Sequence, residues 1–256
     1  MGMLINGKWD NDADRSMASG RYRREESALV TAIGQNHLHG MQQDPGRFVL
    51  VASASCPWSH GAVIALVLSE LSDRVPIQWA GGPRVEGYGL RPTGPISDHG
   101  QIKHAHQLYA LTDPGYTGRA TVPILWDSAE QKALSNSSGD IISAFNRAGG
   151  GPDLQPKHLS RDIETLTKEI FDGLSNAVYR AGKAERQDEY DDASYMVFAT
   201  MARLEDRLGD QRSLFGDVLS TADVRLFATL VPFDPISATH FRCPRKRMVD
   251  HPAQFR

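Results

Sequence analysis

A segment rich in glycine and proline, residues 149–156 (GGGPDLQP), separates two parts of the chain that have different hydrophobic patterns. Such a concentration of turn-forming residues interrupts both helices and strands. Before it, short apolar runs typical of strands alternate with helical stretches. After it, apolar residues recur only at the three- and four-residue steps of helices. Because 256 residues also exceed the size of most single domains, the sequence predicts two domains joined by this linker.

The first domain is predicted over residues 47–148 as an α/β structure. Its opening run RFVLVASAS indicates a strand, the stretch PWSHGAVIALVLSEL after Cys56 indicates a helix, and RVPIQWA indicates a second strand. These elements form a βαβ unit with Cys56 at its first turn. The run TVPILWD and residues 132–134 then predict a hairpin of two strands, and SSGDIISAFN predicts a closing helix.

In two further segments of the N-terminal half, apolar residues do not recur with a clear helical or strand period. Residues 1–46 are polar and interrupted by glycines, so we expect an extended N-terminal arm that lies on the first domain. Residues 81–120 are rich in glycine and proline, with one short helix expected near residues 101–111. We interpret this second segment as a long functional insertion.

The second domain, residues 157–256, is predicted to be entirely helical. One amphipathic helix carries Ile163, Leu166, Ile170, Leu174 and Val178, and a second carries Met196, Ala199, Met201, Leu204 and Leu208. A third begins near Leu219, where Ser220 can cap the helix and Asp223 can reach back to form a capping box.

Composition and charge exclude several classes of function. A net charge of −3 provides no general attraction to nucleic acid or to an anionic membrane. No segment offers the roughly 18 consecutive apolar residues of a membrane span, and the N-terminus lacks the pattern of a secretory signal. The two cysteines, Cys56 and Cys243, are too few for a disulfide framework in a secreted chain of this length. We therefore expect a cytoplasmic protein with neither nucleic-acid nor membrane partners.

Cys56 is the strongest candidate for a reactive residue. It follows an apolar strand and precedes a helix that begins with Pro57, the residue favoured at the first helical position. A thiol there faces unpaired backbone N–H groups and the positive end of the helix dipole, which favour the nucleophilic thiolate. The alternative is a small buried apolar residue, the usual role of a free cysteine. Cys243 lies in a basic, proline-containing turn with no helix start, and we expect no catalytic role for it.

Three other patterns each leave two interpretations open. Val122-Pro123 at the entry to a strand is consistent with a cis peptide bond that leaves the Val122 backbone able to pair with an extended peptide ligand, or with a simple strand entry. Ser137 and Ser138 open a helix, where they could hold a carboxylate or only cap the helix. His104 and His106 are two residues apart and would point to different faces of a helix, so a metal site is not expected there.

Six short segments occur in an order that resembles a known family. They are CPW, GRATVPILWD, LSNSSGDIISAFN, NAVYRAG, and LSTADVRLFATLVPFDP followed by THFRC. Together they resemble the glutathionyl-hydroquinone reductases, the Xi class of the glutathione S-transferase superfamily, from the opening MGMLINGKWD to Pro252. The resemblance implies the glutathione S-transferase fold, with a thioredoxin-like N-terminal domain and an all-α C-terminal domain, and pairing of two copies through the helical domains.

The resemblance also implies a reaction and its residues. In this family a cysteine attacks the sulfur of a glutathionyl-hydroquinone, the hydroquinone leaves, and a second glutathione resolves the cysteine–glutathione mixed disulfide. Carried over by position, Cys56 is the nucleophile and Tyr179 of NAVYRAG assists proton transfer. Arg119, Val122 and Ser138 match positions that contact glutathione, the co-substrate, and no metal is expected.

Three departures from the family pattern bear on the site. Ser137 stands where the family usually has a glutamate that pairs with the ammonium of glutathione, and Tyr88 stands where it has a tryptophan. The chain ends at Arg256, several dozen residues before members usually end, so we expect an incomplete helical domain and acceptor site. Two alternative functions follow: a glutaredoxin-like deglutathionylase or thioether lyase, and a non-catalytic relative that binds glutathione.

Overall fold

The computed structural model describes residues 2–13, 17–18, 21–22, 29, 33–97 and 101–255. By its internal contacts the chain divides into two compact units. The first comprises Met1–Asp14 and Glu26–Pro152, and the second comprises Arg15–Glu25 and Asp153–Arg256. The division after Pro152 falls inside the glycine- and proline-rich segment, residues 149–156.

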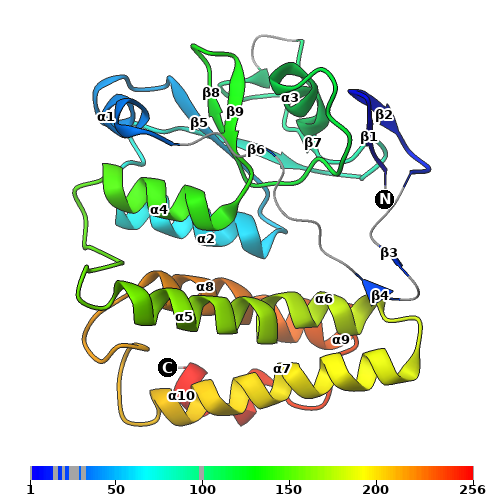
Figure 1. Cartoon of the computed structure of the whole chain (residues 1–256), viewed down its shortest axis with the longest axis vertical. Coiled ribbons are helices and arrows are strands. Elements are labelled where there is room, and N and C mark those ends of the chain that lie inside the picture. Colours follow the sequence, from blue (N-terminus) through cyan, green and yellow to red (C-terminus); the bar gives the residue numbers. More distant parts are fainter. Residues whose placement is uncertain are drawn as a thin grey trace. The chain divides into compact units, whose positions relative to one another are not determined.

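The first unit is built on a sheet of five strands in the order β7-β6-β5-β8-β9 (Figure 1). The strands are β5 (Phe48–Ala52), β6 (Ile77–Gly81), β7 (Gly89–Leu90), β8 (Ile124–Asp127) and β9 (Lys132–Ser135). β5 runs parallel to β6 and antiparallel to β8, and β8 and β9 form a hairpin. Every residue of β5 is buried because this strand has neighbours on both sides. The predicted βαβ unit and the predicted hairpin are both confirmed.

Helices cover both faces of this sheet. They are α1 (Gln35–Gln43), α2 (Pro57–Leu68), α3 (Ala105–Thr112) and α4 (Ser138–Ala148). α2 and α4 pack side by side on one face, whereas α3 contacts β9 on the other (Figure 1). The short helix expected near residues 101–111 is confirmed as α3. This arrangement is the thioredoxin-like domain that the sequence predicts.

A partly buried ion pair stabilises one end of the sheet. Arg47, next to β5, donates from Nε and Nη2 to the carboxylate of Asp127 at 3.0 and 2.8 Å. The Asp127 side chain is fully buried, and it also accepts the backbone N–H groups of Ala129 and Glu130. Burial alone would raise the pKa of Asp127, but the hydrogen bonds from Arg47 and from the two backbone N–H groups outweigh it and lower that pKa.

The N-terminal residues differ from the expected extended arm. β1 (Met3–Ile5) and β2 (Lys8–Asp10) form a hairpin through Asn6 and Gly7, whose φ angles of 49° and 75° are positive. Asn-Gly is the favoured sequence for such a two-residue turn. Further along, residues 35–43 are helical as α1, and the short strands β3 (Met17–Ala18) and β4 (Arg21–Tyr22) belong to the second unit. Leu4 pairs with Gly118, so the first residues do lie on the first unit, but the hairpin and α1 show that residues 1–46 are not one extended arm.

The second unit is helical wherever its residues from 153 onward form regular structure. Its helices are α5 (Ser160–Ile170), α6 (Asn176–Lys183), α7 (Gln187–Leu208), α8 (Thr221–Leu230), α9 (Ala238–His240) and α10 (Pro252–Phe255), with π-helical turns at Phe171–Ser175 and Phe233–Ser237 and a 3-10 turn at Met248–Asp250. Their buried apolar faces meet in one core. The expected first helix is divided by the first π-helical turn into α5 and α6, whereas the second lies within α7.

The start of α8 confirms the predicted capping box. The N–H of Asp223 donates to Ser220 Oγ at 3.4 Å, and the carboxylate of Asp223 accepts the Ser220 N–H at 2.9 Å. These bonds satisfy N–H groups that a helix start leaves without intrahelical partners.

Among the helices of the described residues, none has the length and hydropathy needed to cross a bilayer.

Candidate active site

Cys56 lies where the sequence places it, between β5 and α2. It is the N-cap of α2 with extended backbone angles, and Pro57 occupies the first helical position. Its side chain is buried, with 6% exposed, and its Sγ lies 3.6 Å from the carbonyl oxygen of Val122. Cys56 thus occupies the turn between β5 and α2, beside the backbone of Val122.

His60, one turn further along α2, is the nearest titratable residue in sequence. Burial lowers the pKa of its imidazole, so the ring is neutral at neutral pH. His60 therefore brings no positive charge to the start of α2 at neutral pH.

The segment with Val122 is held against Cys56 by a buried tyrosine. The peptide bond between Val122 and Pro123 is cis, as the sequence allowed, and Val122 is buried. The hydroxyl of Tyr109, on α3, donates to the carbonyl oxygen of Thr121 at 2.8 Å and accepts its N–H at 3.0 Å. Tyr109 thus fixes both backbone groups of the residue before Val122, a positioning role that sequence reasoning missed.

Ser137 and Ser138 lie at the start of α4. Ser137 is the N-cap, and its Oγ accepts the N–H of Asp140 at 3.3 Å. Both serine side chains are half-buried. Just before them, Asn136 donates to Thr121 Oγ1 at 3.5 Å, which joins this helix start to the segment of Val122. The first unit therefore brings Cys56, Val122 and the start of α4 into one connected region.

Tyr88 and Arg119 are both linked to α3. The guanidinium carbon of Arg84 lies 3.5 Å from the centre of the Tyr88 ring, a cation–π contact. The carbonyl oxygen of Tyr88 accepts the N–H of Ala105 at the start of α3. The carbonyl oxygen of Arg119 accepts the hydroxyl of Tyr116, whose ring packs against Tyr109. The roles of Tyr88 and Arg119 in binding glutathione stay predictions.

Tyr179 belongs to an aromatic group in the second unit. Its ring lies 4.7 Å from that of Phe241 and 6.4 Å from that of Tyr22, and it is half-buried on α6. Arg242 secures Phe241 in this place, because its Nη2 donates to the carbonyl oxygens of Ala181, Gly182 and Ala184 at the end of α6. The motifs NAVYRAG and THFRC thus form one structural element, which their separation in sequence concealed.

Cys243 has a different environment from Cys56. It is fully buried in the core of the second unit, and its Sγ donates to the carbonyl oxygen of Phe241 at 3.4 Å. Burial raises the pKa of this thiol to about 11, so it stays protonated at neutral pH. The structure therefore supports the expectation that Cys243 has no catalytic role.

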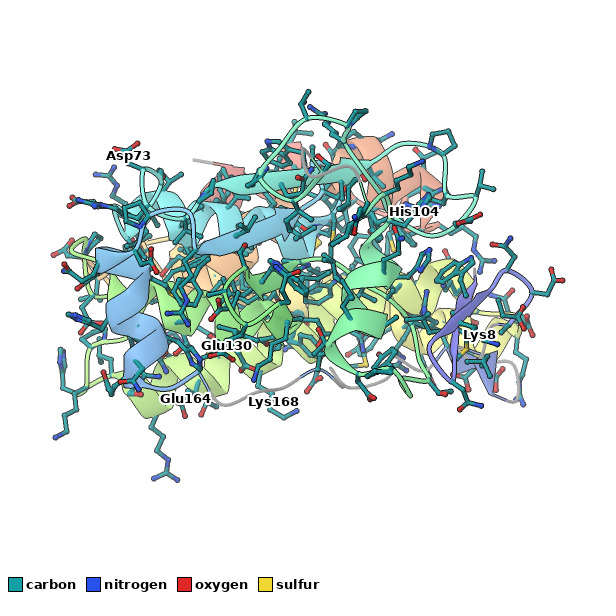
Figure 2. All side chains as sticks on the ribbon, turned by 90° about the horizontal axis from the view of Figure 1, so that it is seen from above. Lys8, Asp73, His104, Glu130, Glu164 and Lys168 are labelled. Carbon is teal, nitrogen blue, oxygen red and sulfur yellow. The ribbon has the colours of Figure 1, made fainter. Side chains whose placement is uncertain are left out.

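His104 and His106 do not point to different faces, contrary to expectation. His104 precedes α3 in an extended conformation, so the helical period does not relate the two residues. Their rings are parallel within 13° with centres 5.4 Å apart. Burial, aided by nearby His104 and opposed by Glu86, lowers the pKa of His106. Figure 2 labels His104 on the same side as the β1–β2 hairpin, whose Trp9 ring stacks on His106.

Comparison with known proteins identifies relatives of the whole chain. A family model described as "Glutathione S-transferase, C-terminal domain" matches residues 187–253. The chain is 37% identical over 262 residues to glutathionyl-hydroquinone reductase PcpF of Sphingobium chlorophenolicum, which covers 98% of this chain and 82% of the relative.

Solved structures agree with this similarity. The glutathione-bound structure of YqjG, a glutathione transferase homolog from Escherichia coli K-12, has a TM-score of 0.78 and 37% identity over 83% of this chain and 72% of that one. A Xi class glutathione transferase from Natrialba magadii has a TM-score of 0.84 and 30% identity over 100% of this chain and 80% of that one. The fold, the position of Cys56 and the extent of these matches show that the chain belongs to the glutathionyl-hydroquinone reductases, the Xi class of the glutathione S-transferase superfamily.

Proposed function

We propose that this protein uses glutathione to reduce glutathionyl-hydroquinones or related aryl thioethers, with Cys56 as the nucleophile. The observation that carries the proposal is the position of Cys56 at the start of α2, beside the backbone of Val122. Among the relatives, PcpF is named for this activity. A thiol at the end of a strand and the start of a helix is suited to forming a mixed disulfide.

The proposed reaction proceeds in two steps. The Cys56 thiolate attacks the sulfur of the glutathionyl thioether, an S–S bond forms, and the bond between sulfur and the aromatic carbon breaks. The leaving carbon takes its electron pair and one proton, which we assign to Tyr179, and the free hydroquinone departs. A second glutathione thiolate then attacks the mixed disulfide, which releases the Cys56 thiolate and oxidised glutathione. One thioether is reduced, and two glutathione equivalents end as the disulfide.

The backbone of Val122 and the start of α4 are the proposed contacts for glutathione. Extended peptide ligands pair with exposed backbone N–H and C=O groups, and a carboxylate suits the N–H groups of a helix start. Ser138 lies in the first turn of α4, and the hydrogen bond from Asn136 to Thr121 keeps that turn beside Val122. Arg119 and Tyr88 are proposed as further contacts for glutathione.

A substrate panel tests this function. Purified protein is given a glutathionyl-hydroquinone, a glutathionylated peptide disulfide and a β-aryl thioether, each with glutathione, and product formation is followed by chromatography. We expect the first to be turned over fastest. Faster turnover of the peptide disulfide would instead establish a deglutathionylase. Mass spectrometry for a glutathione adduct on Cys56 separates either enzyme from a relative that only binds glutathione.

Replacement of Tyr179 by phenylalanine is expected to slow turnover by about 10²-fold, because the change removes only the hydroxyl that donates the proton. The ring contacts with Phe241 and Tyr22 are retained, so the melting temperature should stay nearly unchanged. Steady-state kinetics and thermal unfolding together make the measurement. A variant with normal turnover and a lowered melting temperature would show that Tyr179 only packs.

Replacement of Ser137 by glutamate is expected to tighten glutathione binding by roughly tenfold or more. A carboxylate would form a charge-assisted hydrogen bond with the ligand ammonium, which contributes about 1.5–3 kcal/mol. Calorimetric titration with glutathione measures the change. Ser137→Ala is the matched control, because it removes the cap to Asp140 without adding a charge. Asp140→Ala should weaken glutathione binding only if the Asp140 carboxylate already binds the ammonium of glutathione. Unchanged affinity in Ser137→Glu would show that the ammonium does not lie beside residue 137.

Homodimerisation and a cytoplasmic location are further parts of this proposal. Both cysteines are free thiols, as expected in a reducing compartment. Phe227 and Val231, at and just after the last turn of α8, expose 56% and 50% of their surface, an apolar area available to a second copy. Sedimentation of the purified chain measures the association state.

A further inference from the structure

Three side chains with metal-binding atoms converge beside α3, outside the region around Cys56. Glu86 lies in the loop before β7, His104 immediately precedes α3, and His106 is the second residue of that helix. One ligand atom from each lies within 4.8 Å of the other two. Glu86 Oε2 is 3.8 Å from both His104 Nδ1 and His106 Nε2, which is too far for a direct hydrogen bond. The three ligand atoms therefore lie near one another at separations that a single ion could bridge.

His106 gives an independent indication that this cluster binds a ligand. Its Nε2 is buried and has no hydrogen-bond partner within the described part of the chain, although only 12% of the side chain is exposed. Buried polar atoms in folded proteins nearly always have a partner, and an exception calls for a water molecule or an ion. The unpartnered nitrogen faces the carboxylate of Glu86 and the second imidazole.

The surrounding structure holds these residues in place. The N–H of Leu90 donates to the carbonyl oxygen of Lys103 at 2.7 Å, and the N–H of Ala105 donates to that of Tyr88 at 2.8 Å. These two bonds tie the loop of Glu86 to the start of α3. The Trp9 ring lies 4.8 Å from that of His106, and a Cβ added at Gly87 would lie 3.0 Å from Trp9, so the two approach closely. Such support orients metal ligands before the ion arrives.

We propose that Glu86, His104 and His106 bind one divalent transition metal ion of the zinc type. Two imidazoles and one carboxylate are a common set of protein ligands for zinc, with the fourth position left to water. Zinc–ligand distances of about 2.0–2.2 Å place tetrahedral ligand atoms roughly 3.3 Å apart. The two distances of 3.8 Å from Glu86 can shorten to that value by rotation of Glu86, whose side chain is 50% exposed, and small rotations of the imidazoles adjust the remaining separation, which is at most 4.8 Å.

A second group with similar residues does not satisfy the same conditions. His37, Asp127 and Glu130 also bring ligand atoms within 4.8 Å of one another. However, both carboxylate oxygens of Asp127 are already bonded to Arg47, and one of them accepts two backbone N–H groups as well. A metal cation there would compete with the Arg47 guanidinium for Asp127 and would be repelled by its positive charge. The cluster beside α3 contains no cationic side chain among its three members.

Zinc titration of the full-length protein tests the site. Protein stripped with a chelator is titrated with Zn²⁺ in competition with a chromophoric chelator, and we expect one equivalent to bind. Because loss of supporting residues around metal sites typically weakens binding 10–100-fold, loss of a ligand in Glu86→Gln or His106→Ala should weaken it at least tenfold. His39→Ala is the matched control, since it removes an exposed imidazole from α1 and should leave binding unchanged.

Two further measurements separate this site from the thiols and from misfolding. Co²⁺ bound to the wild-type chain should lack the intense near-ultraviolet band of thiolate ligation, and Cys56→Ser should bind Zn²⁺ as the wild type does. Saturating Zn²⁺ should raise the melting temperature of the wild type by on the order of 5 °C and that of Glu86→Gln by much less. Equal Zn²⁺ affinity in the wild type, Glu86→Gln and His106→Ala would overturn the proposal, as would loss of the site in Cys56→Ser.

Discussion

Replacement of Cys56 by serine should reduce the turnover of glutathionyl-hydroquinones by at least about a thousandfold. A serine hydroxyl has too high a pKa to attack sulfur near neutral pH, and it cannot form the mixed disulfide that the second glutathione resolves. The substitution changes one atom at the N-cap of α2, where serine is itself a favoured residue, so the fold should be retained. Single-turnover kinetics with mass spectrometry of the adduct measure the loss.

Cys243→Ser is the matched control for this experiment. Because the Cys243 thiol is buried and its pKa is raised to about 11, the variant should keep most of the activity. Its melting temperature reports the cost of placing a hydroxyl in the core of the second unit. Equal loss of turnover in Cys56→Ser and Cys243→Ser, in proteins that remain folded, would contradict a single nucleophile.

Replacement of Arg47 by methionine should lower the free energy of unfolding of the first unit by about 3–5 kcal/mol. The change leaves the fully buried carboxylate of Asp127 without its cation, and an uncompensated buried charge is costly. Chemical denaturation followed by circular dichroism measures the loss. The matched control is Lys168→Met, because Lys168 pairs with Asp172 on an exposed helix face and such pairs contribute below about 1 kcal/mol. Equal effects in both variants would show that the Arg47 pair is no stronger than a surface pair.

The same pair predicts how stability depends on pH. The pKa of Asp127 is lowered in the folded state, so its contribution is present above the unfolded value of about 4 and is lost as pH falls through the folded value. The difference between wild type and Arg47→Met should therefore be widest near neutral pH and shrink below about pH 4. Denaturation curves between pH 3 and 7 make this measurement. A difference that widened toward acid would reverse the assigned sign.

The parts of the fold that the sequence predicted have long and consistent patterns of apolar residues. β5, α2 and β6 form a continuous apolar series, and the β8–β9 hairpin and α4 follow at normal spacing. α1 was missed because it is mostly polar and contains Gly40, which usually weakens a helix. In the structure a Cβ at Gly40 would lie 2.8 Å from the ring of Phe48, so glycine permits the close packing of this helix on β5. The sequence alone does not reveal this packing requirement, because Gly40 and Phe48 approach each other only in the folded chain.

The division between α5 and α6 shows a second limit of prediction from the sequence. Apolar residues continue at helical spacing across residues 163–178, so the pattern predicts one helix. The π-helical turn Phe171–Ser175 changes the local hydrogen bonding without interrupting the apolar series. Periodicity alone cannot detect it.

The residues of the candidate site also fall into those that the sequence can predict and those that it cannot. Cys56, Val122 and Ser138 could be named because strand ends, prolines and helix starts leave local signals in the sequence. Tyr109 could not, since its function depends on its hydroxyl meeting the backbone of Thr121, 12 residues later in the chain. The pairing of His104 with His106 was misjudged because the helix begins between them, at Ala105, and a shift of one residue in a helix start reverses such an expectation.

The bonds from Arg242 to the end of α6 bear on how the protein is made. The segment Glu26–Pro152 contains Cys56, Val122 and the start of α4, and it leaves the ribosome before any residue of α6. Tyr179 follows, but its neighbour Phe241 and the anchoring Arg242 are synthesised more than fifty residues later. Because domains generally fold in the order of synthesis, Cys56 takes its place in the nascent chain first. The aromatic group around Tyr179 is complete only after residues 241 and 242 have been synthesised, so the surroundings of the thiol form before those of the tyrosine.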